Sequence, residues 1–259
     1  MKVVIFAGGV GTRISEESHL RPKPMIEIGG QPIIWHIMKI YESHGFNDFI
    51  VCLGYKGYLI KEYFMNYFIH NSDVTINIKN NSLKVHQTNT ESFTITLVDT
   101  GLNTKTAGRL KRIKKYVEGE TFMLTYGDAV TDLNLTKVLE FHKKHGKTAT
   151  VTSVQPAGKF GSLEIQNNGD VSKFMEKPKG DGLWINGGFF VLQPGVFDFL
   201  NGDMDGIMWE EYPLTEITRK RQLVAYKHEG FWKCMDAMRD KIELDQLWEA
   251  GIAKWKTWK

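Results

Sequence analysis

Short apolar runs and helical periodicities alternate along the first 70 residues. The run from Val3 to Ala7 is continuously apolar and stops at a glycine pair, which is the pattern of a strand buried on both faces. A segment that opens at Pro32 repeats apolar residues at helical spacing until Gly45, and Asp48 to Leu53 is again a buried strand. Tyr58 to Phe68 returns to helical spacing. The order strand, helix, strand, helix predicts parallel strands.

Residues 73–98 have the alternating texture of antiparallel strands. We expect a hairpin with its turn at Asn80-Asn81, followed by a strand at Thr94 to Val98 that returns to the main sheet. Strands and helices then alternate again. The predicted helices are Thr106 to Val117 and Leu135 to His145, and the predicted strands are Thr121 to Tyr126 and Ala149 to Val154.

The last third of the chain has shorter elements and no clean linker. The predicted strands are Leu163 to Ile165, Val171 to Glu176, Ile185 to Leu192 and Leu223 to Tyr226, and helices are predicted from about Pro213 and from Met235 through Trp248. We find no internal repeat and no low-complexity tract. The chain is therefore predicted to be one α/β domain over residues 1–259, with a single doubly wound, Rossmann-like sheet. The sheet should be mixed but mostly parallel, with helices on both faces and small β insertions, and its strand ends should form the site.

Composition excludes several classes of protein. A chain of 259 residues with 42% hydrophobic and 24% charged residues can bury a full core, so disorder is excluded as the default. No apolar run approaches the ~18 residues that cross a membrane. A net charge of +3 does not indicate a nucleic-acid or membrane partner. Cys52 and Cys234 fit no metal-site spacing, and the first apolar run is too short for a signal peptide, so we expect a cytoplasmic protein.

A glycine-rich loop, Gly8-Gly9-Val10-Gly11-Thr12-Arg13, directly follows the first predicted strand. Glycines let the backbone approach a ligand closely and turn its N–H groups toward phosphate oxygens. The spacing is not that of the dinucleotide motif, and the G-K-[ST] of a P-loop is missing. For the glycines alone, a plain tight turn is an alternative. Arg13 and Lys23 favour a polyphosphate site, because they place fixed positive charges beside the loop.

This loop and the segments after it resemble the sugar-nucleotidyltransferase family, whose pattern is G-G-x-G-T-R-L followed by a lysine-proline pair. Ile14 stands where that pattern has leucine, which is a volume-conserving change. The likeness covers nearly the whole chain. It is carried by Pro24 to Pro32, Gly54 to Gly57, Tyr126 to Asp128, Glu176 to Pro178 and Asn186 to Gly188, which follow one another in family order.

Within the family, the sequence is similar to the members that transfer a cytidylyl group to glucose 1-phosphate. The shared segments are Ile14 to Glu17, Val98 to Gly101, Gly108 to Arg112 and Trp255 to Trp258. Thymidylyl-transferring members tend to have a serine-lysine-glutamine run where this chain has Pro22-Lys23-Pro24. The resemblance implies the fold of nucleotide-diphospho-sugar transferases, CTP and glucose 1-phosphate as substrates, CDP-glucose and pyrophosphate as products, and Mg²⁺ as cofactor. UTP, dTTP or another hexose 1-phosphate is an alternative, and so is a noncatalytic sensor of sugar nucleotides.

The resemblance also assigns roles to residues. Arg13 and Lys23 are expected to be the catalytic cations that hold the nucleotide phosphates, and Asp128 and Asp236 to hold the metal. Nucleotide binding is expected from Phe6, Ala7, Gly8, Gly9, Val10, Gly11, Thr12, Arg13, Lys23, Thr104, Gly108, Arg109 and Asp128. A sugar-phosphate oxygen that attacks the α-phosphorus in line needs positioning and charge neutralisation rather than a covalent nucleophile.

On the sugar side, the resemblance places Lys177 on the sugar phosphate, Glu176 on sugar hydroxyls, and Asn186 and Gly187 on the hexose. It implies a nucleotide-binding part at about residues 1–130 and a sugar-phosphate-binding part at about 131–259. It also implies a homo-oligomer, with a hexamer for the cytidylyl members, and a place in nucleotide-sugar biosynthesis for O-antigen polysaccharide.

The residues taken one at a time leave other interpretations open. Asp128 is also compatible with an Asx-type cap, Asp236 with a helix N-cap, and Arg109 with a solvated basic helix face. Glu176 and Lys177 are also compatible with a surface ion pair. His142 and His145 lie three apart on a predicted helix, but the lysines around them favour a solvated face over a metal site. Those lysines are Lys143, Lys144 and Lys147.

Overall fold

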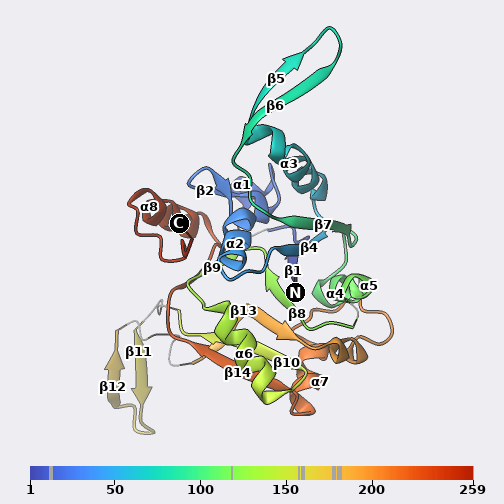
Figure 1. Ribbon diagram of the computed structural model, residues 1–259. Coiled ribbons are helices and arrows are strands. Elements are labelled where there is room, and N and C mark those ends of the chain that lie inside the picture. The colour runs from blue at the N-terminus through green and yellow to red at the C-terminus, as the bar shows by residue number, and fades with distance from the viewer. Residues whose placement is uncertain are drawn as a thin grey trace.

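A seven-stranded sheet forms the centre of the computed structural model, which describes residues 1–11, 14–117, 119–156, 158, 161–176, 179 and 183–258 (Figure 1). The strand order is β14-β10-β13-β8-β1-β4-β7. β1 (Lys2–Ala7) lies between β4 (Asp48–Leu53) and β8 (Phe122–Tyr126) and is parallel to both, and β7 (Thr94–Asp99) continues the parallel half beyond β4. These strands match the predicted apolar runs.

The other half of the sheet contains its antiparallel strand. β13 (Ile185–Leu192) runs antiparallel to both β8 and β10 (Ala149–Val154), and β14 (Leu223–His228) is parallel to β10. The predicted mixed, mostly parallel sheet is confirmed.

Apolar layers cover both faces of the sheet. Along β1, Val3 and Ile5 belong to one buried cluster and Val4 and Phe6 to the other, as the period of two in a strand requires. The first cluster includes residues of α2 (Ile33–Glu42), α3 (Gly57–His70), α6 (Leu135–His145) and α8 (Met238–Glu249). The second includes residues of α4 (Thr106–Arg112), α5 (Lys114–Val117), η4 (Pro194–Phe199) and α7 (Tyr212–Arg219). Burial on both faces explains why the strand sequences are continuously apolar.

The predicted helix over 106–117 is interrupted. Ile113 has φ −93° and ψ 3°, which ends α4, and α5 begins at Lys114. The fully buried Ile113 side chain packs in the second cluster. Two short helices therefore replace the single helix that the periodicity indicated.

Small two-stranded sheets are inserted between the main elements. β5 (Ser72–Asn77) and β6 (Ser82–Thr88) form a ribbon that stands off the body, and β11 (Ser162–Ile165) pairs with β12 (Val171–Met175) (Figure 1). The shorter pairs are β2 (Glu27–Ile28) with β3 (Gln31–Pro32), and β9 (Ala129–Thr131) with β15 (Trp232–Cys234). Two further short helices are α1 (Ser15–Ser18) and η2 (Lys23–Met25). The predicted β insertions are confirmed.

The interpretation of His142 as part of a solvated face is wrong. Its side chain is fully buried, and its ring nitrogens lie 2.8 Å from Thr150 Oγ1 and 2.9 Å from Gln193 Nε2. His145 is half-buried, and its Nε2 lies 2.7 Å from the same Thr150 oxygen. Burial lowers the pKa of His142 to about 4. The lysines next to His142 in sequence lie on the exposed side of α6, whereas His142 faces the core. Neighbours along the sequence therefore do not indicate which side of the helix His142 faces.

The C-terminal tail closes over a second buried histidine. His36 on α2 is fully buried, and the rings of Trp35, Trp248 and Trp255 lie 5.1, 4.7 and 6.2 Å from it, centroid to centroid. Burial lowers the pKa of His36 to about 4. The tail tryptophans are therefore part of the core.

Among the helices of the described ranges, none has the length and apolar character needed to cross a membrane.

Candidate active site

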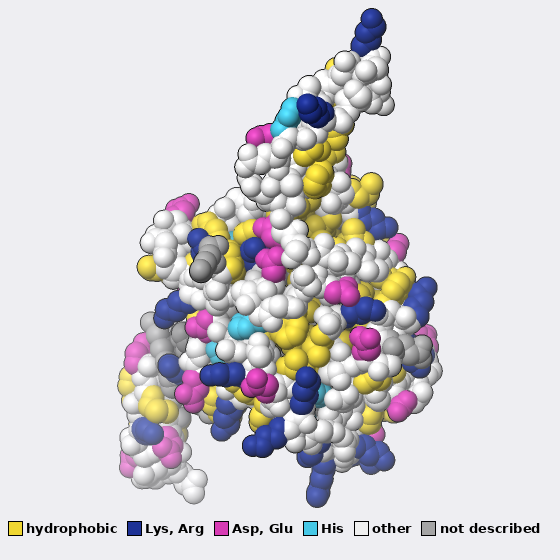
Figure 2. All heavy atoms as spheres, in the orientation of Figure 1, with side chains coloured by type: hydrophobic (Ala, Val, Ile, Leu, Met, Phe, Trp, Pro, Cys, Tyr) yellow, Lys and Arg dark blue, Asp and Glu magenta, His cyan; other side chains and the backbone are white. Residues whose placement is uncertain are grey.

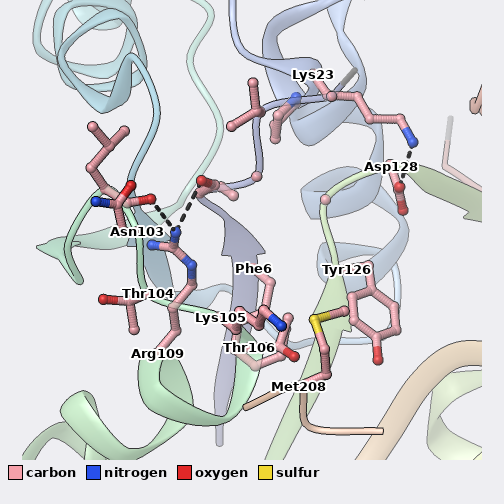
Figure 3. A pocket seen from close by; sticks show the side chains of 18 of the residues that line it. Phe6, Lys23, Asn103, Thr104, Lys105, Thr106, Arg109, Tyr126, Asp128 and Met208 are labelled. Atoms are coloured by element: carbon pink, nitrogen blue, oxygen red, sulfur yellow. Dashed lines mark hydrogen bonds and ion pairs between the residues drawn. The ribbon is translucent and has the colours of Figure 1, made fainter. Parts of the chain in front are cut away.

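A pocket of about 560 Å³ lies at the carboxyl ends of β1 and β8 (Figure 3). Most of the predicted nucleotide-binding residues line it, namely Phe6, Ala7, Gly8, Gly9, Val10, Gly11, Lys23, Thr104, Arg109 and Asp128. Gly108 is not among its lining residues but packs directly behind Thr104, whose Cγ2 would lie 2.6 Å from a Cβ at position 108. Thr12 and Arg13 lie outside the described residues. The position of the pocket is that expected for ligands of open α/β sheets.

Arg109 ties the walls of the pocket together. Its guanidinium donates from Nη1 to Leu53 O over 2.8 Å and to Thr100 Oγ1 over 2.7 Å. From Nη2 it donates to Gly8 O over 3.0 Å, a contact that is drawn in Figure 3. The residue is only 4% exposed, so the solvated basic face is the wrong interpretation. These contacts fix the ends of β1 and β4 against α4, and therefore fix the glycine loop against the loop before α4.

Glycine at position 8 is a steric requirement of this arrangement. A Cβ there would lie 2.2 Å from Arg109 Nη1, and a Cβ at Gly54 would lie 2.6 Å from the same atom. Gly11 has φ +70°, a conformation that glycine adopts without strain. The sequence singled out Gly8 for its approach to phosphate, and the structure adds its approach to a buried arginine.

Lys23, Asp128 and Asp236 form the charged end of the pocket. Lys23 Nζ donates to Asp128 Oδ2 over 2.7 Å and to Asp236 Oδ1 over 2.6 Å. Burial by itself would lower the pKa of Lys23, but the two carboxylates outweigh it and raise that pKa above its usual value. The lysine therefore stays protonated and holds the two carboxylates together.

The β9–β15 pair brings the two aspartates together across more than a hundred residues. Cys234 lies opposite Ala129 in this pair, and Met235 N donates to Asp128 O over 2.8 Å. Asp236 is not the N-cap of α8, because that position is Ala237. Asp240 Oδ2 accepts hydrogen bonds from the backbone N–H groups of Asp236 and Ala237, over 3.1 and 2.9 Å. The N-cap interpretation of Asp236 is wrong.

Cys234 joins the two aspartates. Its Sγ and one carboxylate oxygen from each of Asp128 and Asp236 lie within 4.8 Å of one another. Burial, followed by the neighbouring Asp128 carboxylate, raises the pKa of the thiol above its usual value. The spacing of the two cysteines along the chain fits no metal motif, so the sequence does not predict this role for Cys234. The sequence does show that Cys234 lies two residues before Asp236. This closeness indicates a shared site with Asp128 only once the pairing of β15 with β9 is known.

The donor set fits the divalent cation that the resemblance implies. Two carboxylates at one end of a pocket are the oxygen ligands that Mg²⁺ uses together with substrate phosphates. Asp128 and Asp236 are such a pair, and the ammonium of Lys23 lies between them. The site is therefore built around a positive charge.

The pocket lining also includes Thr106, Tyr126, Met208 and Glu210, which the sequence did not identify as site residues. Tyr126 donates a short hydrogen bond from its hydroxyl to Glu210 Oε1, and Thr106 Oγ1 donates to Glu210 Oε2 over 3.2 Å. Burial raises the pKa of Glu210. Met208 also lines the pocket, beside Tyr126 (Figure 3). The segment around Met208 and Glu210 has neither helical nor strand periodicity, so the sequence does not indicate that it contributes to a site. Its backbone nevertheless holds the start of α4 in place, because Lys105 N donates a hydrogen bond to Asp205 O over 2.7 Å.

The pocket lining does not include the predicted sugar-side residues that the structure describes. Among the described residues, Glu176, Asn186 and Gly187 are not in its lining, and Lys177 lies outside the described residues. Asn186 Oδ1 accepts from Gly188 N over 2.8 Å, and Gly187 O accepts from Trp232 Nε1 over 2.7 Å. The neighbouring Gly188 connects this segment to the pocket, because a Cβ there would lie 2.5 Å from Tyr126 Cδ2.

Comparison with known proteins adds independent findings. Residues 2–248 match the profile of the family described as Nucleotidyl transferase. The chain is 56% identical over 259 residues to glucose-1-phosphate cytidylyltransferase of Salmonella typhi, covering 100% of both chains. It is 43% identical over 258 residues to the probable glucose-1-phosphate cytidylyltransferase of Bacillus subtilis (strain 168), again covering 100% of both.

Solved structures share the fold at low sequence identity. HddC from Yersinia pseudotuberculosis has a TM-score of 0.67 and 22% identity, covering 95% of this chain and 99% of that one. A putative glucose-1-phosphate thymidylyltransferase from Bacillus anthracis has a TM-score of 0.68 and 18% identity, covering 95% and 94%. These two likenesses bear on the fold alone, and they confirm the predicted class.

Proposed function

This chain belongs to the nucleotidyl transferase family, and we propose that it transfers the cytidylyl group of CTP to glucose 1-phosphate, giving CDP-glucose and pyrophosphate. The observation that carries this function is the 56% identity, over the full length of both chains, to an enzyme named for that reaction. The pocket adds physical support, because it joins a glycine loop to a lysine and two aspartates.

The reaction asks the protein to position two anions and to neutralise charge. A phosphate oxygen of glucose 1-phosphate attacks the α-phosphorus of CTP, a P–O bond forms there, and the bond from the α-phosphorus to pyrophosphate breaks. No covalent enzyme intermediate is needed. We assign phosphate contacts to the backbone of Phe6 to Gly11 and to Lys23, with Thr12 and Arg13 completing the loop.

We assign the metal to Asp128 and Asp236. Members of this family generally use a divalent cation, and we propose Mg²⁺ because the two donors are carboxylates. When bound, Mg²⁺ neutralises triphosphate charge and orients the leaving pyrophosphate. Lys23 bridges the two aspartates in the structure, and we assign it a further contact to the nucleotide phosphates.

The base and the sugar are assigned to different segments. We place the cytosine at the loop from Thr104 to Arg109, where Gly108 gives Thr104 its room and Arg109 fixes the loop to Gly8. On the sugar side we assign Lys177 to the sugar phosphate, Glu176 to the hydroxyls, and Asn186 with Gly187 to the hexose. This division makes residues 1–130 mainly nucleotide-binding and 131–259 mainly sugar-phosphate-binding.

We further propose that the chain acts as a homo-oligomer, a hexamer in the assembly that the family resemblance implies. The β5–β6 ribbon supports this, since Ile76 pairs with Leu83 and Val74 with Val85 on one face of it. Ile76 and Leu83 are 55% and 48% exposed, and Figure 2 shows hydrophobic side chains at the base of the ribbon, where it meets the body. An exposed apolar face of this kind marks an interaction surface.

Light scattering during gel filtration tests the assembly. We expect a mass well above the 29.7 kDa of one chain, and a lower mass for the double variant Ile76→Thr, Leu83→Thr. A single-chain mass for the unmodified protein at assay concentration contradicts the proposal.

We place the reaction in the cytoplasm, on the ground that Cys52 and Cys234 are both free thiols. Cys234 lies against the assigned metal ligands, so its oxidation would add atoms at the charged end of the pocket.

The experiment that tests the function follows the product. Purified protein is incubated with CTP, glucose 1-phosphate and Mg²⁺, and CDP-glucose is identified by anion-exchange chromatography and mass spectrometry. We expect equal amounts of CDP-glucose and pyrophosphate, and no product without glucose 1-phosphate. Binding of CTP without any product would favour the noncatalytic sensor instead.

A further inference from the structure

The charged end of the pocket contains a sulfur ligand in addition to its two carboxylates. Cys234 Sγ lies within 4.8 Å of ligand oxygens on both Asp128 and Asp236. The ligand atoms of a tetrahedral Zn²⁺ site lie roughly 3.3 to 3.6 Å apart, as Zn–S and Zn–O bonds of about 2.3 and 2.0 Å at tetrahedral angles require. Side-chain rotations that shorten the separations by about an ångström therefore bring all three atoms onto one ion.

The ammonium group of Lys23 already occupies the position that a metal ion would take. The Lys23 ammonium lies 2.7 Å from Asp128 Oδ2 and 2.6 Å from Asp236 Oδ1, so the oxygens that would hold an ion already converge on a positive charge. The lysine is tethered to this place by its own backbone in η2 and competes with any ion that enters.

The chemistry of the donors separates two classes of ion. Mg²⁺ takes oxygen ligands and gains nothing from a thiolate, whereas Zn²⁺, Co²⁺ and Cd²⁺ bind thiolate sulfur strongly. A pocket made for Mg²⁺ alone has no use for sulfur at this position. We propose that Asp128, Cys234 and Asp236 together bind a thiophilic divalent cation such as Zn²⁺ in place of the Lys23 ammonium, and that this ion inhibits cytidylyl transfer.

This inference rests on the proposed function only for the inhibition. On binding, the thiol loses its proton to the buffer and the ion displaces the lysine from both carboxylates. The ion then occupies the assigned Mg²⁺ site with one position taken by sulfur, which leaves fewer positions for the phosphates of CTP. Enzyme turnover should fall with rising Zn²⁺ and recover when a chelator removes it.

The direct test needs no nucleotide and no turnover. The protein is titrated with Co²⁺, and the sulfur-to-cobalt charge-transfer absorption in the near ultraviolet is recorded. We expect one equivalent of Co²⁺ to produce the band in the unmodified protein and in Cys52→Ala, whose thiol lies fully buried elsewhere in the sheet. Cys234→Ser should lose the band and bind Co²⁺ at least about tenfold more weakly. A band of full strength in Cys234→Ser overturns the proposal.

A second variant tests the position of the ion. If the ion takes the place of the ammonium, Lys23→Met should bind Co²⁺ at least about tenfold more tightly than the unmodified protein, because the competing charge is removed. Lys39→Met is the control, since Lys39 pairs with Glu42 and Glu91 on another part of the surface. Unchanged affinity in Lys23→Met places the ion elsewhere and contradicts the proposal.

These results are distinguishable from a failure of the proposed function. If the protein makes no CDP-glucose but shows a cobalt band that depends on Cys234, the metal site is supported and the assigned reaction is contradicted. If CDP-glucose forms normally, no cobalt band appears, and Cys234→Ser is as sensitive to Zn²⁺ as the unmodified protein, the reaction is supported and the metal site is contradicted.

Discussion

Lys23 Nζ donates a hydrogen bond to Asp236 Oδ1 over 2.6 Å, although 213 positions separate the two residues along the chain. The contact joins η2 to the segment after β15, and Asp128 completes it from between β8 and β9. Lys23 thus places one positive charge between the two carboxylates that we assign to the metal.

The first prediction concerns Asp236. Asp236→Asn should lower turnover by at least about 100-fold, because an amide leaves the charge of the metal and of Lys23 uncompensated. Pyrophosphate release at saturating CTP and glucose 1-phosphate measures it, with a thermal melt to show that the fold persists. Asp170→Asn, on the exposed turn of the β11–β12 ribbon, is the matched control and should keep its rate. An undiminished rate in Asp236→Asn would remove the residue from the metal site.

The second prediction separates the two substrates. Lys177→Ala should raise the KM for glucose 1-phosphate at least about tenfold and leave the KM for CTP nearly unchanged, because a charge-assisted contact to the sugar phosphate is lost. Lys173→Ala, an exposed lysine on β12, should change neither constant. Equal weakening of both substrates, or an effect confined to CTP, would show that Lys177 is placed on the wrong ligand.

The third prediction concerns the buried guanidinium of Arg109. Arg109→Ala removes the charge-assisted hydrogen bonds that the carbonyl oxygens of Gly8 and Leu53 accept from the buried guanidinium, and should lower the free energy of unfolding by about 2 to 4 kcal/mol. It should also reduce kcat/KM for CTP more than it changes the KM for glucose 1-phosphate, because the base loop loses its tie to the glycine loop. Denaturant titration and steady-state kinetics measure the two effects.

Arg109→Lys distinguishes shape from charge. A lysine keeps the positive charge but has no planar fork to reach Leu53, Thr100 and Gly8 together, so it should rescue little of the loss. Lys115→Ala, an exposed lysine on α5, should be neutral in both measurements. Full rescue by lysine would mean that only the charge of Arg109 matters.

The fourth prediction is a loss of stability in mild acid. His36 and His142 have folded-state pKa values of about 4, below the value of about 6.5 expected in the unfolded chain. Between these values the unfolded state binds protons that the folded state does not, so the free energy of unfolding is highest above pH 6.5 and falls as the pH drops toward 4. Each histidine contributes about 3 kcal/mol to this fall.

Urea titrations at a series of pH values measure the slope. His142→Gln keeps hydrogen-bonding groups beside Thr150 and Gln193 but has no proton to gain, so its stability should depend less on pH than that of the unmodified protein. A variant with the full acid slope would show that His142 does not control it.

The sheet was largely predictable because its strands are buried on both faces. Val3 to Ala7 and Phe122 to Tyr126 are apolar runs with helical segments between them, and this order alone implies parallel pairing. The place of the glycine loop at the pocket was predictable as well, since Gly8, Gly9 and Gly11 come directly after the first apolar run. Ile113 was not, because its break in the helix is set by packing rather than by local propensity.

Parts of the site depend on tertiary contacts that no spacing reveals. Arg109 lies among lysines in the sequence and points inward in the fold, because Gly8 and Gly54 leave room for its guanidinium. Cys234 becomes a neighbour of Asp128 only through the β9–β15 pair. Glu210 reaches Tyr126 from a segment with no periodicity at all. Contacts between site residues that are far apart in the sequence can be found in the structure but not from local sequence patterns.

We propose that this pocket selects CTP as the donor of the cytidylyl group that is transferred to glucose 1-phosphate, and the ratio of kcat/KM for CTP to that for UTP and dTTP tests this most directly. The 4-amino group of cytosine is a donor where uracil and thymine have an acceptor, so the wrong base leaves polar groups of the Thr104 to Arg109 loop unpaired. We predict that CTP exceeds both by at least roughly tenfold, the equivalent of one contact of about 1.4 kcal/mol. Equal use of UTP by the unmodified protein would contradict the cytidylyl assignment.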